Sequence, residues 1–435
     1  MSSELEIQPL GDFVTLVSGN TPSKSNANYW GGDIPWISAK DMGDFWISDS
    51  EDHITPEGAS VASRLVPAGA VLLLTRGMTL HKRVPICRTA KPATFNQDVK
   101  AVLPRPGVSS RFVPYLLVGN HDRLHAKVDS AGHGTGRLNT EAILSLPVWV
   151  PDLKEQDRIA DVGEALDDRI TLLRKTNATL EAIAQALFKS WFVDFDPVRA
   201  KAEGRQPEGM DAATAALFPD SFEESELGLV PKGWGIGNVG DVASQKKGSV
   251  NPLASPEELF EHFSLPAFDS GQAPVFELGQ EIKSNKTPLP EEAVLLSKLN
   301  PHIPRIWLPV SYGANAVCST EFLAYSPRSG GSKEFIYCLF RSDEFQQQLC
   351  QLVTGTSNSH QRVKPDQILG IKLPVADKPV LEGFTKSVRP LFDRAHANRL
   401  QAQTLTQLRD TLLPRLISGQ LRLPEAEQCV EEALA

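Results

Sequence analysis

The sequence contains several partial matches to known catalytic motifs, and each match lacks residues that the motif requires. The stretch GHGTG at 132–136 resembles part of a dinucleotide-binding loop, but no strand–turn–helix pattern surrounds it and its third glycine is wrongly spaced. The sequence has neither a G-x-x-x-x-G-K-[ST] phosphate loop nor the Asn-Pro-Pro-aromatic motif of adenine methyltransferases. Pro151-Asp152 and Pro219-Asp220 lack the acid-x-Lys of the common nuclease site, and the histidines do not cluster at metal-ligand spacing. We therefore expect no catalytic or metal site.

Polar side chains that could bind nucleic acid are better supported. Arg and Lys donors, Asn and Gln amides, and Ser and Thr hydroxyls match the hydrogen-bond patterns of base edges in the major groove. No acid lies between Glu57 and Asp98, whereas six Lys and Arg residues do. Acid-free windows at 293–320 and 345–365 hold further cations. A solvated surface is the alternative interpretation of any such charge run.

The candidate DNA-binding residues lie in polar stretches that we expect to be loops held by rigid domains. In the first half of the chain they are Lys24, Asn26, Asn28, Lys40, Thr75, Arg76, Lys82, Arg83, Arg137 and Asn139. In the second half they are Lys246, Lys247, Lys298, Asn300, Asn358, Ser359, His360, Gln361, Arg362 and Lys364. Each of them, taken alone, has the alternative of being an ordinary solvated residue.

Two long helices are predicted to position these residues. Apolar residues recur at steps of three and four over 155–192, and no proline interrupts that run. A second run with its own apolar face covers 380–413. At about 1.5 Å per residue, the first helix would be roughly 57 Å long. An ordinary amphipathic core helix is the alternative for the first run considered alone.

An internal repeat links each long helix to the block before it. A shift of 225 positions pairs Arg137 with Arg362 (362 − 137 = 225) and Ile143 with Ile368. The chain therefore reads as a globular block and a long helix, followed by a divergent block and a matching helix. Such a repeat is a stronger indication of architecture than any local motif.

The composition indicates a soluble protein with room for two or three domains in its 435 residues. The N-terminus is acidic rather than a signal peptide, and no apolar run is long enough to cross a bilayer. The five cysteines are scattered, so neither a disulfide framework nor a zinc site is expected, and the cytoplasm is the default location. The formal charge of −9 opposes nucleic-acid binding at first sight, but the acids crowd the stretches at 194–226 and 425–432.

Alternating short apolar runs and helical patterns predict an α+β fold in both blocks. We expect strands at 71–75, 101–104, 293–300 and 321–326, and helices within 111–128 and at 332–353. The predicted parts are a first domain at 1–151, a long helix at 152–192, a linker at 193–233, a second domain at 234–376, a second long helix at 377–420 and a frayed acidic tail at 421–435.

Several stretches resemble the specificity subunit of type I restriction–modification systems over nearly the whole chain. They are SGNTPSKSNANYWGGDIPWISAKDM near the start, ILSLPVWVPDLKEQDRI, LFKSWFVDFDPVRAKAEG, SELGLVPKGW, GTSNSHQRVKPDQILGIKLPV and LLPRLISGQL near the end. One departure is that the second helix is entered by ADKPVLEGF, where the first has LKEQDRI. The Glu-Gln signature therefore occurs once.

The resemblance implies two target-recognition domains, each of which reads one half of a split, asymmetric site in double-stranded DNA. It also implies that the two long helices pair as an antiparallel coiled coil that serves as spacer and docking surface. Two methyltransferase subunits would bind there, and translocase–nuclease (restriction) subunits could join them in a hetero-oligomer for host defence. No cofactor would be bound by this chain; S-adenosylmethionine, ATP and magnesium would belong to the partner subunits.

The sequence thus predicts a non-catalytic subunit that recognises DNA and acts as a scaffold. A self-sufficient restriction–modification enzyme is disfavoured by the missing methyltransferase and nuclease motifs. A coiled-coil adaptor that binds only protein is the remaining alternative.

Overall fold

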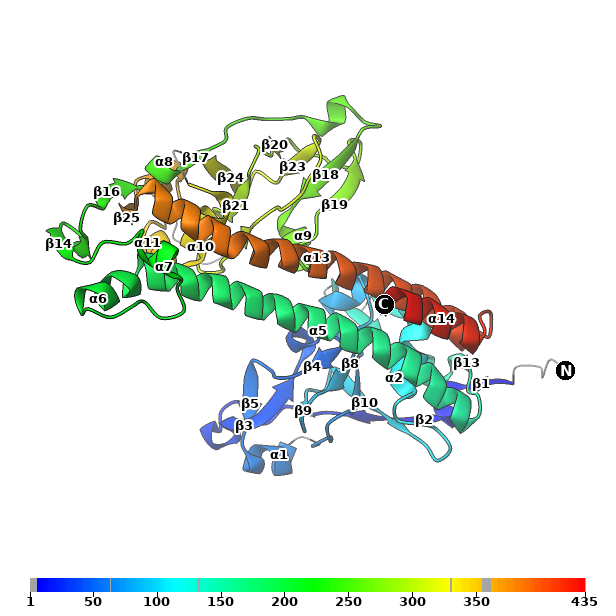
Figure 1. The fold of residues 1–435 in the computed structure, drawn as a ribbon. Helices are drawn as coiled ribbons and strands as arrows, with labels where there is room; N and C mark the ends of the chain where they lie inside the picture. The colour runs from blue at the N-terminus through cyan, green and yellow to red at the C-terminus, as the bar shows by residue number, and fades with distance from the viewer. Residues whose placement is uncertain (1–5, 63, 131–133, 329–330, 354–360, 435) are drawn as a thin grey trace. The chain divides into compact units, whose positions relative to one another are not determined.

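A computed structural model of the chain describes residues 6–62, 64–130, 134–328, 331–353 and 361–434. It contains two compact units, here called unit 1 (Met1–Arg174 with Leu400–Ala435) and unit 2 (Lys175–Arg399). The two predicted long helices are confirmed as α5 (Leu153–Phe192) and α13 (Lys378–Ile417), each an uninterrupted run of 40 residues (Figure 1). Each helix contributes its first part to one unit and its second part to the other.

Unit 1 is built of short strands and helices that precede α5, together with α14, which follows α13. Its strands are β1 Ile7–Pro9, β2 Val14–Ser18, β3 Trp30–Ile37, β4 Trp46–Ile47, β5 Asp52–Ile54, β6 Val71–Leu74, β7 Arg76–Gly77, β8 Ile86–Thr89, β9 Thr94–Phe95, β10 Val99–Pro104, β11 Val128–Ser130, β12 Gly136–Leu138 and β13 Pro147–Trp149. Its short helices are α1 Pro56–Ala62, α2 Val113–Gly119, α3 His121–His125, α4 Thr140–Leu144 and α14 Leu423–Leu434, with 3-10 turns η1 Leu10–Asp12, η2 Ala27–Tyr29, η3 Ala39–Asp41 and η4 Met78–His81.

Unit 2 repeats the same mixture of elements. Its strands are β14 Phe222–Ser225, β15 Gly228–Pro231, β16 Gly235–Asn238, β17 Ala243–Gln245, β18 Leu259–Phe263, β19 Val275–Leu278, β20 Thr287–Pro288, β21 Val294–Ser297, β22 Ile306–Trp307, β23 Ala316–Cys318, β24 Phe322–Pro327 and β25 Lys372–Val375. Its helices are α6 Asp196–Ala202, α7 Ala212–Ala215, α8 Val239–Val242, α9 Leu265–Asp269, α10 Lys333–Arg341, α11 Asp343–Gln351 and α12 Pro365–Leu369, with the 3-10 turn η6 Pro252–Ala254.

The sheets of the two units have matching strand orders, as the internal repeat predicts. The order β2-β10-β6-β8-β4 in unit 1 corresponds to β17-β24-β21-β22 in unit 2. The order β5-β3-β9 corresponds to β19-β18-β23, and in both the first pair is antiparallel and the second is parallel. A two-stranded ribbon, β1-β13 or β16-β25, comes just before each long helix. The predicted α+β class is confirmed.

The long helices pack against each other in antiparallel fashion within each unit. In unit 1, Asp167 of α5 contacts Arg409 of α13 through a 2.6 Å ion pair, and the earlier Ala160 packs with the later Leu413. In unit 2, the Asn177 side-chain amide donates to the Ala395 carbonyl at 2.9 Å. The rings of the later α5 residues Phe188, Trp191 and Phe192 pack edge-to-face with Phe384, which precedes Ala395. The predicted antiparallel pairing is therefore present inside each unit.

Gly163 is the single glycine of α5, and the packing of unit 1 requires it. The ring of buried Tyr115, on α2, lies so close to Gly163 that a Cβ there would overlap its carbon atoms. Gly119 at the end of α2 plays the same part toward α13, since an added Cβ would lie 2.6 Å from the Ile417 side chain. Both glycines let α2 approach the long helices closely.

Three expectations are corrected or refined by the structure. The helix predicted at 332–353 is two helices, α10 and α11, because Ser342 is extended and its hydroxyl caps α11 by accepting from the Phe345 N–H. The predicted frayed tail is wrong: residues Leu423–Leu434 form α14, which buries Leu423 and Val430 in the core of unit 1. The predicted linker at 193–233 is folded, with Phe195 and Phe218 inside the core of unit 2.

Within the described ranges, no helix combines the length and the apolar character needed to cross a membrane.

Candidate nucleic-acid interface

In unit 1, two predicted cations are brought together by strand pairing. Strand β7 pairs with β12 in antiparallel register, so that Arg76 lies directly opposite Arg137. Side chains in such a pair share one face of the sheet and have Cβ atoms about 4.5–5.5 Å apart. Both arginines are exposed, and Asp129 lies opposite Arg137 on its other side. Neither arginine has an ion pair within the described part of the chain, so Asp129 is the one carboxylate that faces Arg137 across a strand pair, and Arg76 and Arg137 leave an excess of positive charge.

The 3-10 turn η4 packs on β12, the strand that carries Arg137. A Cβ at Gly136 would lie 2.8 Å from the Leu80 Cβ, so a glycine is needed there for η4 to pack on β12. His81 of η4 is 2.7 Å from the Gly134 carbonyl through its Nε2 atom. Lys82 and Arg83 follow η4; Lys82 is exposed, while Arg83 donates to the Met42 and Gly43 carbonyls at 3.1 and 2.9 Å.

Other candidates of unit 1 already have structural partners. The Thr75 side chain is buried, and its hydroxyl donates to the Asp98 carbonyl at 2.9 Å, so it supports β7 rather than facing a ligand. Lys40 forms ion pairs with Glu51 and Asp52 at 2.9 and 3.0 Å, and these hydrogen bonds raise its pKa. Thr75 and Lys40 are therefore less suited to contact DNA than the sequence pattern predicts.

The remaining polar candidates of unit 1 shape turns. Asn26 accepts a hydrogen bond from the Asn28 N–H at 3.1 Å and caps η2, where Lys24 and Asn28 are exposed. Asn139 caps α4 in the same way by accepting from the Glu141 N–H at 3.1 Å. These are the local hydrogen bonds that asparagine makes at helix starts.

Unit 2 contains the same pairing of segments that are distant in sequence. Leu299 and Arg362 form an antiparallel bridge. The Val363 N–H donates to the Lys298 carbonyl at 3.1 Å, and the Asn300 N–H donates to the Gln361 carbonyl at 2.8 Å. In unit 1 the equivalent bond runs from the Leu138 N–H to the Thr75 carbonyl at 2.8 Å.

The strand pairing thus gathers four predicted residues of unit 2, namely Lys298, Asn300, Gln361 and Arg362. The Asn300 backbone is left-handed at φ 49°, a conformation that asparagine tolerates, and its buried Oδ1 atom has no hydrogen-bond partner among the described residues. Exposed Lys364 follows at the start of α12, and exposed Lys246 and Lys247 follow β17. Asn358, Ser359 and His360 lie outside the described residues.

Arg362 differs from its unit 1 counterpart because it is held by a carboxylate. Its Nε atom donates to one Glu321 oxygen at 3.2 Å and its Nη2 atom to the other at 3.0 Å. These hydrogen bonds raise the pKa of Arg362. Glu321 is absent from the residues that the sequence predicts, because a carboxylate is not expected to contact a DNA phosphate. One signal does mark it: the acid-free windows end at Glu321 in the second half and at Asp98 in the first.

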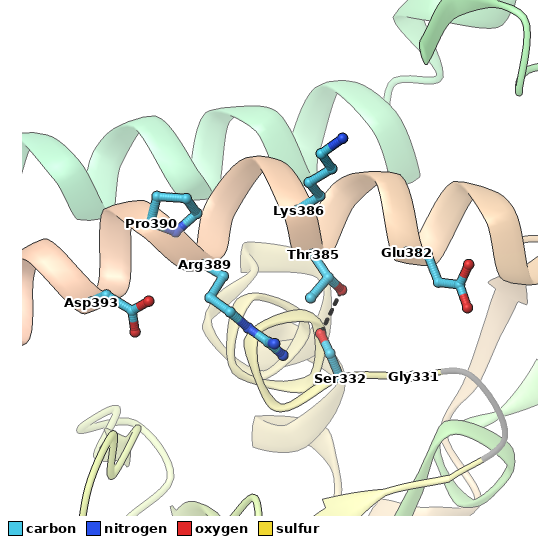
Figure 2. Close-up of a pocket in the computed structure, with 8 residues that line it drawn as sticks. All are labelled: Gly331, Ser332, Glu382, Thr385, Lys386, Arg389, Pro390 and Asp393. Carbon is cyan, nitrogen blue, oxygen red and sulfur yellow. Dashed lines mark hydrogen bonds between the residues drawn. The ribbon is translucent and has the colours of Figure 1, made fainter. Parts of the chain in front are cut away.

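A cavity of about 600 Å³ lies in unit 2 between α13 and the start of α10. Figure 2 shows Arg389 and Thr385 of α13 beside Ser332, which receives a 2.8 Å hydrogen bond from the Thr385 hydroxyl. Arg389 is fixed by an ion pair with Glu334, and Glu382, Lys386 and Asp393 add charges of both signs. Because its charges are mixed and its arginine is already paired, this cavity offers no concentrated positive surface.

The exposed guanidinium and amide groups of this arrangement have the chemistry that suits an anion. The described residues include no group of three or more His, Cys, Asp and Glu side chains arranged to hold a metal ion. The paired segments instead present guanidinium and amide groups on short strands, supported by packed turns. Guanidinium groups bind phosphates and base edges through parallel hydrogen bonds.

Comparison with known proteins relates the chain to one family. The family described as the type I restriction modification DNA specificity domain matches residues 2–182. The type I restriction enzyme MjaIX specificity subunit of Methanocaldococcus jannaschii is 27% identical over 97% of this chain and 94% of its own length. The HindI specificity subunit of Haemophilus influenzae is 26% identical over 72% of this chain and 78% of its own.

A solved structure has the same fold. The crystal structure of the S subunit of a type I restriction–modification system from M. genitalium superposes with a TM-score of 0.55. It covers 96% of this chain and 97% of its own, at 13% sequence identity.

Proposed function

This chain belongs to the family of type I restriction–modification specificity subunits, and from that premise we propose how it recognises DNA. Each unit reads one half of a bipartite, asymmetric site in double-stranded DNA. The chain has no catalytic role of its own. It supplies sequence specificity to partner subunits that methylate and cut.

The observation that carries this proposal is the paired polar segment found in both units. In each, the segment after a central strand pairs with the segment before a short helix, and an arginine stands at the equivalent place, Arg137 or Arg362. In such an interface, contacts to phosphates position a protein on the duplex, and contacts to base edges specify the sequence. Two copies of one reading surface suit a site made of two halves.

The long helices are proposed to dock two methyltransferase subunits and, with them, restriction subunits. Three large apolar side chains support this role because they are exposed in the middle of the long helices. They are Leu172 and Leu400 in unit 1, which are 53% and 50% exposed, and Ile183 in unit 2. S-adenosylmethionine, ATP and magnesium would then be bound by the partners, and the assembly would act in the cytoplasm.

The test is to purify the chain alone and together with its cognate methyltransferase subunit, and to map N6-methyladenine on a plasmid library. We expect no methylation by the chain alone and methylation at one split motif by the complex. Methylation by the isolated chain would contradict the non-catalytic role. A complex that forms but methylates without sequence preference would favour the adaptor that binds only protein.

A further inference from the structure

The two units place an acid in the same position beside the arginine segment. The Thr75 N–H donates to the Asp98 carbonyl at 2.8 Å, and the Lys298 N–H donates to the Glu321 carbonyl at 3.0 Å. Thr75 and Lys298 are also the residues whose carbonyls accept from the opposite segment. Asp98 and Glu321 are therefore structural equivalents.

The equivalent acids interact differently with the equivalent arginines. Glu321 has one more methylene than Asp98, and it occupies the Arg362 guanidinium with two hydrogen bonds. Among the described residues, Asp98 makes no ion pair with Arg137. The residue opposite the arginine on the segment after the central strand also differs, since it is Arg76 in unit 1 and Leu299 in unit 2. On its other side, Arg137 lies opposite Asp129 without an ion pair among the described residues.

The arginines of the two units differ in how readily they can accept an anion. Like charges directly opposite each other on paired strands destabilise the pair, so Arg76 and Arg137 together favour a bound anion. In unit 2, the Glu321 carboxylate accepts hydrogen bonds from the same guanidinium edge that a phosphate would use. An exposed ion pair of this kind is weak and exchangeable, because water and salt compete with it.

We propose that Glu321 is an internal competitor for the DNA backbone. Arg76 and Arg137 of unit 1 contact phosphates whenever DNA is near, whereas Arg362 of unit 2 does so only when a phosphate displaces Glu321. Unit 1 thus provides the sequence-independent grip, and unit 2 engages fully only where its other contacts offset the loss of the ion pair. This inference rests on the proposed function, namely that the chain binds DNA.

The experiment measures the affinity of the full-length chain, in complex with its methyltransferase subunit, for a fluorescent random-sequence DNA duplex. Affinity is recorded between roughly 50 and 200 mM salt, because each phosphate contact adds about 0.9 to the slope of log affinity against log salt concentration. Glu321→Gln removes the competing charge and keeps the side-chain shape. It should tighten binding and steepen the slope by about 0.9.

The reciprocal variant in unit 1 is Asp98→Glu, which lengthens the acid beside Arg137. It should weaken binding and make the slope shallower by up to about 0.9. The charge control is Glu226→Gln, which removes a carboxylate from the 2.5 Å ion pair with Lys372 in unit 2. It should leave the slope within error of the wild type. The two main variants change different units, so a folding defect in one leaves the other informative.

The double variant Glu321→Gln/Arg362→Ala locates the effect. It should lose the gain of Glu321→Gln, because the released arginine is absent. The proposal is overturned if Glu321→Gln behaves like Glu226→Gln, or if its gain persists without Arg362. A wild-type complex that binds no DNA would instead refute the proposed function, which separates the two failures.

Discussion

At the scale of the residue, charge alone does not identify the side chains that are free to bind DNA. Arg76 and Lys40 are both exposed cations of unit 1, yet Lys40 is held by Glu51 and Asp52. Arg76 faces another arginine across the strand pair. The difference lies in the neighbours that the fold supplies, and it makes the two residues a matched pair for mutation.

Arg76→Ala should weaken DNA binding, whereas Lys40→Ala should leave it nearly unchanged. If Arg76 contacts a phosphate, affinity for all sequences falls and the salt slope drops by about 0.9. If it makes a bidentate contact to a base, one position of the recognised motif relaxes at a cost of about 1–3 kcal/mol. Salt-dependent binding and mapping of methylated motifs separate these results. Equal effects of the two variants would show that bulk charge, not this arginine pair, governs binding.

The sequence predicted the type and the region of these residues, but not their partners. Thr75 and Arg76 are adjacent in sequence, and only the strand pairing determines that one is buried and the other exposed. Glu321 and Arg362 are 41 positions apart, and nothing local marks them as partners. Side-chain pairing across long sequence separations comes from the tertiary fold, so periodicity and composition could not predict it.

At the scale of the element, the long helices combine an apolar seam with a few buried polar groups. In unit 1, Asp167 and Arg409 form an ion pair with side chains only 2% and 16% exposed. Burial raises the pKa of Asp167, although Arg409 opposes that shift. In unit 2, the buried Asn398 amide donates to the Asn177 side-chain carbonyl at 2.9 Å. Buried polar groups of this kind can fix the register of paired helices.

Breaking the pair of Asp167 and Arg409 should be costly, and replacing both partners should not. Arg409→Met alone leaves the buried Asp167 carboxylate without its ion-pair partner and should lower the free energy of unfolding by about 3–5 kcal/mol. Asp167→Leu alone should cost less, because Arg409 keeps its 2.7 Å ion pair with Asp410. The double variant should recover most of that loss, because both charges leave the low-dielectric seam. Urea denaturation of the four proteins closes the cycle. Additive losses in the double variant would show that the two charges do not interact.

The entry to each long helix shows why the two copies of the repeat differ. Gln156 of the Glu-Gln signature is buried; its side chain donates to the Gly107 and Pro151 carbonyls and accepts from the Ser109 N–H. The position 225 residues later (156 + 225 = 381) is Leu381, which is buried by apolar packing. The signature therefore fixes the start of α5 on its own domain. The signature occurs once because hydrogen bonds of Gln156 hold the start of α5, whereas apolar packing of Leu381 holds the start of α13.

At the scale of the whole molecule, the repeat and both long helices could be predicted because their periodicity extends over many turns. The chain segments that make up each unit could not be predicted from the sequence. Unit 1 contains residues from both ends of the chain, including α14. Glu427 of α14 forms an ion pair with Arg158 of α5, which connects the C-terminal segment to the long helix. The acidic tail pattern indicated fraying, yet Leu423 and Val430 are spaced on one helical face and find a core to cover. A local sequence pattern cannot predict packing against residues from the other end of the chain.

The measurement that tests the central claim most directly is an exchange of one reading block. Residues 6–150 are replaced by the corresponding block of a relative with a known split motif, and methylated adenines are mapped with the cognate methyltransferase subunit present. A second chimera exchanges residues 234–376 and serves as the reciprocal control. Because each unit carries its own paired arginine segment, we predict that each exchange changes one half of the motif and preserves the other. Chimeras that remain active but change both halves together, or neither half, would contradict the assignment of one half-site to each unit.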